Sequence, residues 1–293
     1  MDEVEAWTQG MVGQTLEGRY RLDAVIGIGA MGSVFRGHHL GLGRDMAVKL
    51  LHPQLTANPE MRARFSREAA AASKLDHANC VRVTDFGVTE DGLHFLVMDL
   101  LQGHELTTRL GDRFSPPEAL ALVDQVLAGL EHAHARGLIH RDVKPENIFL
   151  TTDDQGRQVA KLVDFGLTKR PTDERLTEQN LFFGTAAYMS PEQARGSASV
   201  DIRSDLYALG VLFYYLATGE LPFDGEDTYA ILFKQVHEDP PEPQSRNPLL
   251  TDTANFMILK MLSKDPNKRF QTPAELLRAL RKHRDYLVTR SGR

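Results

Sequence analysis

Short apolar runs separated by turn signals dominate the first hundred residues. Such strand-like runs occupy residues 20–34 (two strands around a glycine turn), 45–51, 81–88 and 93–100. The last two flank a Glu-Asp-Gly turn signal and predict a hairpin. One helix is expected at residues 60–75, where apolar side chains recur at spacings of three and four, at Met61, Phe65, Ala69 and Ala72. The first hundred residues are therefore expected to be mostly strand with one helix.

From residue 116 onward the apolar pattern becomes helical. Ser115, two prolines and Glu118 form a capping-box start for a helix that runs to about residue 134. Further helices are expected at residues 206–217, 251–262 and 273–287. A β-rich part followed by an α-rich part is an α+β arrangement, with its joint near residues 99–103. Residues 1–19 lack clear periodicity, which predicts a mobile lead-in.

Composition and charge exclude several classes of protein. The chain has 293 residues, 42% of them hydrophobic and 25% charged, which is typical of a globular protein. A net charge of −6 with neither half basic argues against nucleic acid as a partner. The single cysteine excludes an internal disulfide and suits a reducing compartment. The longest apolar run, residues 206–217, is too short for a membrane span, and the acidic N-terminus is unlike a secretory signal.

A glycine-rich string, Gly27-Ile-Gly-Ala-Met-Gly32, has two readings. The spacing fits a dinucleotide-binding turn, with Asp45 as the acid for the ribose, but that turn requires a helix directly after the last glycine. Residues 33–36 instead alternate in strand fashion. We therefore favour a glycine hairpin lying over a triphosphate, because glycine lets the backbone approach phosphate oxygens closely.

Charged residues farther along the chain complete a pattern of phosphoryl-transfer chemistry. Lys49 ends the predicted third strand, and Glu68 follows on the predicted helix, placed so that the two could pair. The string His140-Arg-Asp-Val-Lys-Pro-Glu-Asn147 must be a loop because its proline excludes a helix interior. Asp164-Phe-Gly166 follows 22 residues after Asp142. A lone lysine or glycine motif would carry little weight, whereas the combination is specific.

Together these strings resemble the signature of eukaryotic-type protein kinases, over roughly residues 20–286. Lys144, two residues after Asp142, resembles the Ser/Thr branch, and residues 190–196 (Ser-Pro-Glu-Gln-Ala-Arg-Gly) resemble its bacterial members. The resemblance implies a bilobal kinase fold, with a β-rich N lobe carrying one main helix and a mostly helical C lobe. The implied boundaries are an N-terminal extension (1–19) and a kinase domain (20–293), divided into N lobe (20–98), hinge (99–103), C lobe (104–286) and basic tail (287–293).

The resemblance also implies an active site for ATP and Mg²⁺, with Mn²⁺ as an alternative metal. Asp142 would accept the proton of the substrate hydroxyl, Lys144 would stabilise the transferred phosphoryl group, and Lys49 would hold the phosphates while paired with Glu68. Asn147 and Asp164 would bind the metal. The nucleotide would contact residues that the motif places along both lobes: Ile26, Gly27, Gly29, Gly32, Val34, Ala47, Lys49, Met98, Asp99, Leu101, Glu105 and Phe149. For the apolar ones, a plain core role is nearly as good from sequence alone.

Structural and regulatory roles follow from the same resemblance. Thr185 would bond the catalytic Asp and Lys, Glu192 and Arg269 would form a buried salt bridge, and Asp205 would hold the catalytic loop from below. Arg141 and Lys169 are two cations near the activation segment, which an anionic group would complete. We predict autophosphorylation at Thr177, with Thr172 as second choice. Leu181 stands where a phosphorylatable Thr is often found, and Tyr207 stands where many kinases carry Trp.

Three alternatives remain open at this stage. Asp85-Phe86-Gly87 spells the metal-binding tripeptide a second time, and we assign it a structural role because it precedes the catalytic loop. A pseudokinase scaffold would normally lack Lys49, Asp142 or Asp164, and all three are present. A small-molecule phosphotransferase would lack the Ser-Pro-Glu segment and the pair of Glu192 and Arg269.

Partners and location are also expectations. We expect protein substrates with Ser or Thr acceptors, no nucleic acid, no membrane span within this chain and a homodimer for autophosphorylation. The cytoplasm is the expected location, with tethering to a membrane through residues outside this chain left open. The basic residues near the C-terminus fit a solvated helix end, which we favour, or a juxtamembrane segment.

Overall fold

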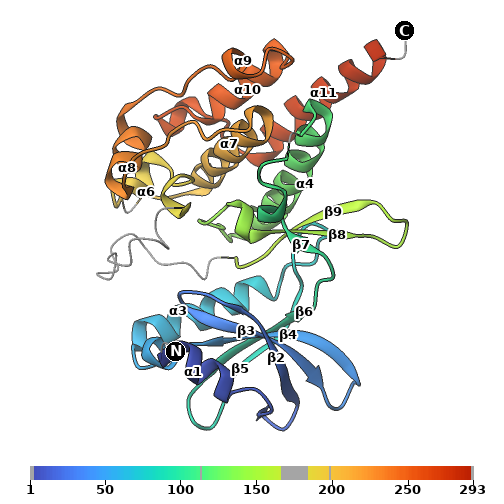
Figure 1. Cartoon of the computed structure of the whole chain (residues 1–293), viewed down its shortest axis with the longest axis vertical. Coiled ribbons are helices and arrows are strands. Elements are labelled where there is room, and N and C mark those ends of the chain that lie inside the picture. Colours follow the sequence, from blue (N-terminus) through green and yellow to red (C-terminus); the bar gives the residue numbers. More distant parts are fainter. Residues whose placement is uncertain (1–2, 113, 166–183, 198, 292–293) are drawn as a thin grey trace. The chain divides into compact units, whose positions relative to one another are not determined.

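The computed structural model describes residues 3–112, 114–165, 184–197 and 199–291 (Figure 1). The chain divides into two compact units, Met1–Gln102 and Gly103–Arg293. The first is built on a sheet, and helices dominate the second. This is the expected α+β arrangement.

The first unit contains a six-stranded antiparallel sheet with the strand order β1-β2-β3-β4-β6-β5. The strands are β1 (Thr15–Leu16), β2 (Tyr20–Ile28), β3 (Gly32–His39), β4 (Arg44–Leu51), β5 (Val83–Val88) and β6 (His94–Asp99). The five strands predicted from the apolar runs are thus confirmed. Short helices α1 (Glu3–Gly10) and α2 (Pro53–Thr56) and the longer α3 (Pro59–Ala72) complete the unit.

Helix α3 forms where the apolar periodicity predicted it. Asn58 caps its first turn by accepting hydrogen bonds from the backbone of Glu60 and Met61. Its buried residues are the four that recur at helical spacing: Met61, Phe65, Ala69 and Ala72. The unit has a further core cluster on the sheet, in which Leu22, Phe35, Val48, Phe95 and Val97 are fully buried.

The N-terminal segment differs from the expected mobile lead-in. Residues 3–10 form helix α1, and residues 15–16 form strand β1, which pairs with β2. Trp7 and Met11 pack against the core cluster, to which Leu16 belongs. These apolar contacts hold a segment whose sequence is too short to display a helical period.

The second unit pairs a small sheet with a set of helices. The sheet has the order β7-β8-β9, from β7 (His104–Glu105), β8 (Ile148–Thr152) and β9 (Gln158–Leu162). Its helices are α4 (Pro116–His134), α6 (Pro191–Ala194), α7 (Ile202–Thr218), α8 (Thr228–His237), α9 (Pro243–Arg246), α10 (Asp252–Met261) and α11 (Pro273–Ser291). Ser115 and Glu118 form the predicted capping box at the start of α4. The four helices expected in this region are confirmed.

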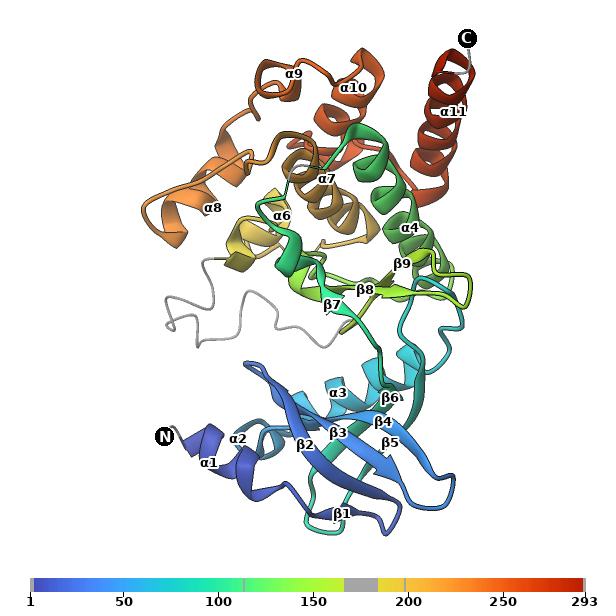
Figure 2. The same ribbon diagram turned by 45° about the vertical axis from the view of Figure 1, so that its right-hand side comes forward.

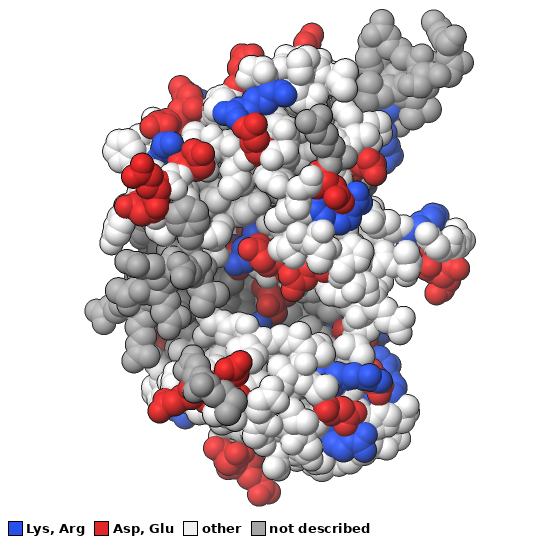
Figure 3. Space-filling model, viewed as in Figure 1, with Lys and Arg blue, Asp and Glu red and all other residues white. Residues whose placement is uncertain are grey.

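Helices α4 and α11 lie side by side in the second unit, and both contribute buried residues to its core. Figure 2 shows α11 beside α4, where Arg281 and Arg284 both form ion pairs with Asp124. Helix α7 is buried along almost its whole length, which explains its nearly unbroken apolar sequence. On the face drawn in Figure 3, acidic and basic side chains are interspersed and the described residues form no continuous basic surface. None of the helices in the described ranges has both the length and the apolar character that crossing a bilayer requires.

Candidate active site

The glycine-rich string forms the turn of the β2–β3 hairpin. Ile28 pairs with Ser33 across the hairpin, and the backbone N–H of Gly29 donates to the carbonyl of Gly32. A strand, not a helix, follows Gly32, so the dinucleotide-binding reading is wrong. Asp45, its candidate ribose acid, accepts hydrogen bonds from Arg36 and lies 2.8 Å from Nδ1 of His38.

The three glycines of the string differ in whether the fold itself leaves room for a Cβ at their position. A Cβ on Gly32 would lie 2.1 Å from the backbone oxygen of Leu50, so the chain itself demands glycine there. A Cβ on Gly29 would come no closer than 3.5 Å to another atom, and one on Gly27 would meet nothing within 4 Å. Neither residue has the positive φ that favours glycine. The described fold thus leaves open space at Gly27 and Gly29, as a loop that receives a ligand needs.

Strands β2, β3, β4 and β6 carry the other predicted nucleotide residues of the first unit, except Leu101. Lys49 on β4 is buried and opposite Val34 on β3, and Ala47 is opposite Met98 on β6. Ala47 and Met98 are also buried, whereas Ile26 is 52% exposed. Glu68 on α3 is half-buried and accepts a hydrogen bond from Arg64 one turn earlier. Asp99 forms an ion pair with Arg44, and Leu101 follows as a half-buried residue.

The second Asp-Phe-Gly tripeptide lies on strand β5. Asp85 accepts hydrogen bonds from the Tyr20 hydroxyl at 2.6 Å and from Arg19 at 2.8 Å. Burial raises the pKa of Tyr20 to about 12, and its hydrogen bond to Asp85 adds to that effect. Asp85 thus fastens strand β2 to strand β5, which is a structural role.

The catalytic-loop string lies in the second unit, between α4 and β8. Asn147 donates from Nδ2 to the Asp142 carboxylate and to the Asp142 backbone carbonyl, both at 2.8 Å. The ammonium of Lys144 lies 3.1 Å from the same carboxylate and donates to the Thr185 hydroxyl at 2.8 Å. Asp142 is therefore held by an amide and a cation, and Lys144 links it to Thr185.

Asp205 on α7 supports this loop from within the core. Its carboxylate accepts hydrogen bonds from the backbone N–H groups of His140 (2.8 Å) and Arg141 (2.7 Å) and lies 2.7 Å from Nε2 of His134. Burial alone would raise the pKa of Asp205, but the hydrogen bonds from His134 and the loop outweigh it and lower the pKa. The loop is thus anchored by a buried carboxylate that stays ionised.

Two non-glycine residues of the site have left-handed backbone. Arg141 has a φ of 65° and Asp164 a φ of 57°. Such conformations cost about 1–3 kcal/mol each and persist only where neighbouring contacts impose them. At Arg141 these contacts are Asp205 on its N–H and Gln193, which donates to its carbonyl at 2.9 Å.

His140 connects the catalytic loop to the Asp164 segment. Its ring lies 3.0 Å from the Val163 carbonyl through Nε2, and its Nδ1 accepts from the Asp142 N–H. One nitrogen donates and the other accepts, which is the pattern of a neutral imidazole, and complete burial lowers the pKa of His140 accordingly. The ring also packs on Phe165, with centroids 4.7 Å apart.

Strand pairing places two further predicted nucleotide residues together. Glu105 on β7 is opposite Phe149 on β8. Glu105 is exposed and accepts a hydrogen bond from Thr107, whereas Phe149 is half-buried. The exposed carboxylate can bind hydroxyl groups, and the aromatic side chain beside it can pack against a flat apolar ring.

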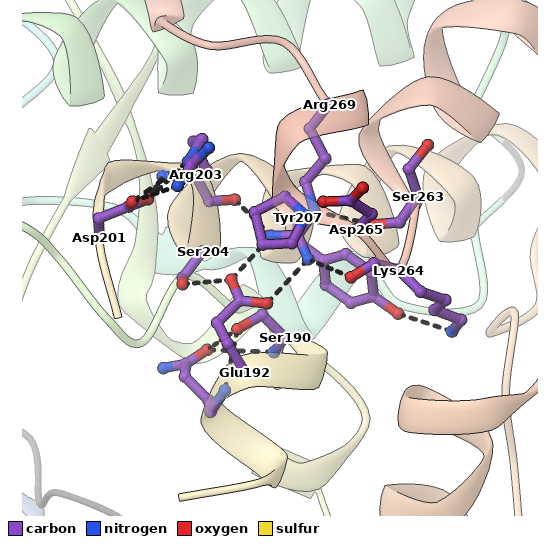
Figure 4. A network of polar contacts seen from close by, with 12 residues as sticks. Ser190, Glu192, Asp201, Arg203, Ser204, Tyr207, Ser263, Lys264, Asp265 and Arg269 are labelled. Atoms are coloured by element: carbon purple, nitrogen blue, oxygen red, sulfur yellow. Dashed lines mark hydrogen bonds and ion pairs between the residues drawn. The ribbon is translucent and has the colours of Figure 1, made fainter. Parts of the chain in front are cut away.

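Figure 4 shows the buried pair of Glu192 and Arg269. The two terminal guanidinium nitrogens contact the carboxylate, at 2.7 and 2.8 Å, and the guanidinium lies 4.8 Å from the centroid of the Tyr207 ring. Arg269 also donates to the backbone carbonyls of Ser263, Arg203 and Lys264. Burial would raise the pKa of Glu192, but the hydrogen bonds and charge of Arg269 lower it instead.

Comparison with known proteins shows the family to which the chain belongs. The family model described as "Protein kinase domain" matches residues 20–280. The chain belongs to this family. It is 42% identical over 270 residues to Serine/threonine-protein kinase pkn3 of Myxococcus xanthus, which covers 89% of this chain and 49% of the relative. It is 35% identical over 268 residues to PrkC of Bacillus subtilis, over 91% of this chain and 40% of the relative. The chain therefore spans about half, or less, of the length of these curated relatives.

A solved kinase domain has the same fold. The crystal structure of the Mycobacterium tuberculosis PknI kinase domain matches with a TM-score of 0.72 and 32% identity, over 92% of this chain and 98% of that one. The bilobal protein-kinase fold implied by the sequence motifs is thereby confirmed.

Sequence reasoning missed part of the polar framework of this kinase domain. The sequence motifs assign no role to Gln193 or His134, although Gln193 donates to a carbonyl of the catalytic loop and His134 contacts Asp205, which supports that loop. The sequence does contain a signal for Gln193, because Ser190-Pro-Glu-Gln193 has the capping-box pattern. The structure contains this capping box. The side chains of Tyr207 and Gln235 hydrogen-bond, and Gln235 donates to the carbonyl of Ala187. This chain of contacts reaches the segment that contains Thr185.

Several predicted residues lie outside the described part of the kinase domain. These are Gly166, Lys169, Thr172, Thr177 and Leu181. Of the regulatory residues, Arg141 alone is described, and its Nε is buried without a hydrogen-bond partner among the described residues.

Proposed function

We propose that this chain is an ATP- and Mg²⁺-dependent Ser/Thr protein kinase, which transfers the γ-phosphoryl group to protein hydroxyls. The observation that carries the proposal is the arrangement of Asp142, Lys144, Asn147 and Thr185 in one hydrogen-bonded set. Membership of the protein kinase family supports it, as do relatives named serine/threonine-protein kinases.

Each residue of the set has a distinct task in this mechanism. The Asp142 carboxylate orients the substrate hydroxyl and accepts its proton as the phosphoryl group is transferred. Lys144 is bonded to Thr185 and places positive charge where the phosphoryl oxygens develop negative charge. Lys49 is buried on β4, and its ammonium would bind the non-transferred phosphates. The chain thus contributes position and charge, with no covalent intermediate.

The residues present fit a divalent metal. Asn147 uses Nδ2 for Asp142, so its oxygen, Oδ1, on the opposite side of the amide, can act as a ligand. Asp164 adds a carboxylate, and hard oxygen ligands suit Mg²⁺ or Mn²⁺. The metal would neutralise charge on the phosphates.

The glycine-rich loop gives a direct test of the nucleotide. We expect Gly29→Ala to fold normally but to raise the KM for ATP, because the added Cβ fits within the chain and enters the ligand's space. Gly32→Ala should instead lower stability, since its Cβ meets the Leu50 carbonyl. Thermal unfolding together with ATP titrations of both variants measures the two effects. Equal KM values for Gly29→Ala and the wild type would contradict phosphate binding by this loop.

The two Asp-Phe-Gly tripeptides are expected to respond differently to mutation. Asp164→Ala should abolish metal-dependent phosphoryl transfer, because it removes a metal ligand. Asp85→Ala should lower stability at most, because Asp85 only fastens Tyr20 and Arg19. Turnover measured against Mg²⁺ concentration distinguishes them. Turnover that survives in Asp164→Ala and disappears in folded Asp85→Ala would reverse the assignment.

A pseudokinase or a small-molecule phosphotransferase predicts other results. The purified chain should be incubated with ATP, Mg²⁺ and protein substrates, and phosphosites should be mapped by mass spectrometry, with Asp142→Asn as the inactive control. We expect phosphate on Ser and Thr in the wild type only. Nucleotide binding without any transfer would support the pseudokinase, and transfer to small hydroxyl compounds alone would support the phosphotransferase.

Regulation by autophosphorylation is a further part of the proposal. Arg141 has a buried Nε without a partner among the described residues, which suits a phosphate oxygen. We expect phosphate on Thr177, acquired between two copies of the chain, and lower activity in Thr177→Ala. Thr172→Ala tests the second choice of site. An active wild type with no phosphate between residues 167 and 185, and full activity of Thr177→Ala, would exclude this switch.

The single cysteine supports a reducing cytoplasm as the location.

A further inference from the structure

Helix α1 contains a threonine that is buried as deeply as any core residue. Thr8 has no exposed surface, although the helix has eight residues and lies before residue 20, where the match to the kinase family begins. Its hydroxyl lies 2.7 Å from the hydroxyl of Ser33, which is fully buried too. A segment outside the common domain is therefore joined to a residue inside it.

Ser33 stands at the base of the glycine-rich loop. It pairs with Ile28 across the hairpin, and this pair closes the turn formed by residues 29–32. Its hydroxyl lies 3.0 Å from Nε2 of His52, a residue that is 4% exposed. The backbone N–H of His52 donates to the Met31 carbonyl at 3.0 Å. His52 thus contacts both the base of the loop, through its ring, and the loop itself, through its backbone.

The direction of the hydrogen bonds between the hydroxyls follows because each hydroxyl has only one hydrogen to donate. The Thr8 hydroxyl donates to the Val4 carbonyl at 2.7 Å, so the Ser33 hydroxyl must donate to Thr8. Nε2 of His52 lies against the Ser33 hydroxyl, and the ring also hydrogen-bonds to the backbone of Ala30, so the tautomer decides which of the two contacts receives its hydrogen. Trp7 packs edge-on against the same ring, with centroids 5.6 Å apart. The hydroxyls of Ser33 and Thr8 thus link the His52 ring to the backbone of α1, and each hydroxyl uses its one hydrogen.

We propose that helix α1 positions the glycine-rich loop for the nucleotide, with Thr8 and Ser33 as positioning residues that act through the loop backbone. The inference rests on the proposed use of ATP. The loop has open space at Gly27 and Gly29, and its own backbone bonds are few, so its base determines where it lies. Loss of the Thr8 hydroxyl leaves the buried Ser33 donor without its acceptor and loosens that base.

The test compares hydroxyl-removing and hydroxyl-retaining variants of the full chain. Thr8→Val keeps the shape of the side chain and removes the hydroxyl, Ser33→Ala removes the same bond from its other side, and Thr8→Ser retains it. Thr84→Val is the matched control, because that hydroxyl donates to Val97 on the sheet, away from the loop. Each variant is assayed for Mg·ATP dissociation constant, KM for ATP, kcat and melting temperature.

We expect Thr8→Val and Ser33→Ala to weaken Mg·ATP binding by about 2- to 10-fold, the usual contribution of the one buried hydrogen bond that the two residues share, with kcat within about twofold of wild type. Each variant removes the bond between Thr8 and Ser33 together with one other contact, to Val4 or to His52, so the two losses should be less than additive in the double variant. Thr8→Ser and Thr84→Val should bind as the wild type does. Hydrogen exchange of residues 29–33 should be faster in Thr8→Val.

Several outcomes would overturn the inference. A lower melting temperature with unchanged ATP affinity in Thr8→Val and Ser33→Ala would make the network a stability element only. Failure of both variants to fold, with Thr8→Ser intact, would lead to the same conclusion. A wild type that does not bind Mg·ATP would instead refute the proposed function, so the two failures can be told apart.

Discussion

Asp142→Asn is expected to lower the turnover of protein phosphorylation by about 10²- to 10⁴-fold, the usual contribution of a general base. The change preserves the size of the side chain. The new amide oxygen can still accept the hydrogen bond that Asn147 donates to the carboxylate, so the loop should keep its conformation. The substitution removes the proton acceptor and the negative charge that faces Lys144. Turnover is measured with saturating ATP and a phosphorylatable protein.

Asp154→Asn is the matched control, because this exposed residue lies in the turn between β8 and β9. It should retain wild-type turnover, and both variants should bind ATP and melt within a few degrees of the wild type. More than a tenth of wild-type turnover in Asp142→Asn would remove Asp142 from the role of base.

The parts of the fold that could be predicted are those where a local pattern decides the structure. The capping box of Ser115 and Glu118 is complete within four residues, and α4 begins there. The alternation after Gly32 distinguishes a strand from a helix, and this decided between the two readings of the glycine string. Both are short-range signals that tertiary contacts did not overrule.

Helix α1 could not be predicted from sequence because tertiary contacts, rather than its own sequence pattern, stabilise it. An isolated helix of eight residues is unstable in water, and two turns display no clear period. Its contacts come from Trp7 on the His52 ring, Thr8 on Ser33 and Met11 on the core cluster. Ser33 is 25 residues from Thr8, and His52 is farther still from Trp7, so no local pattern marks these contacts.

The geometry of the site likewise depends on distant residues. Arg141 is not glycine, and its left-handed backbone is imposed by Asp205 and Gln193, which are 64 and 52 residues away. Composition and spacing do not encode such a constraint. Resemblance to a family supplied the role of Asp205, and the structure supplied that of Gln193.

The pair of Glu192 and Arg269 provides the largest expected effect on stability. The side chain of Arg269 has no exposed surface and that of Glu192 is 9% exposed. Removal of one partner of a buried pair leaves the other charge without compensation, which typically costs about 3–5 kcal/mol. We expect Arg269→Met to lower the free energy of unfolding by this amount, measured by urea denaturation.

The matched control is Arg157→Met. Arg157 pairs with Asp153 at a similar distance, but its side chain is 71% exposed, and such surface pairs contribute about 0–1 kcal/mol. A loss in Arg269→Met no larger than that in Arg157→Met would contradict a structural role for the buried pair. The double variant Glu192→Met, Arg269→Met should recover part of the loss, since it leaves no unpaired charge.

Acidification separates the contribution of the pair from that of the other Arg269 contacts. The pKa of Glu192 is lowered in the folded chain, so its stabilisation is fully present above its usual value of 4.5 and is lost as the pH falls through the lowered value. The difference in unfolding free energy between the wild type and Arg269→Met should therefore begin to shrink above pH 4.5, where burial makes Glu192 of the variant take up a proton, and it should shrink further as the pH falls through the lowered pKa of the wild type. It should not vanish, because Arg269 also donates to three backbone carbonyls whose hydrogen bonds do not depend on the charge of Glu192. A difference that stays constant with pH would assign the whole effect to those carbonyls and none to the ion pair.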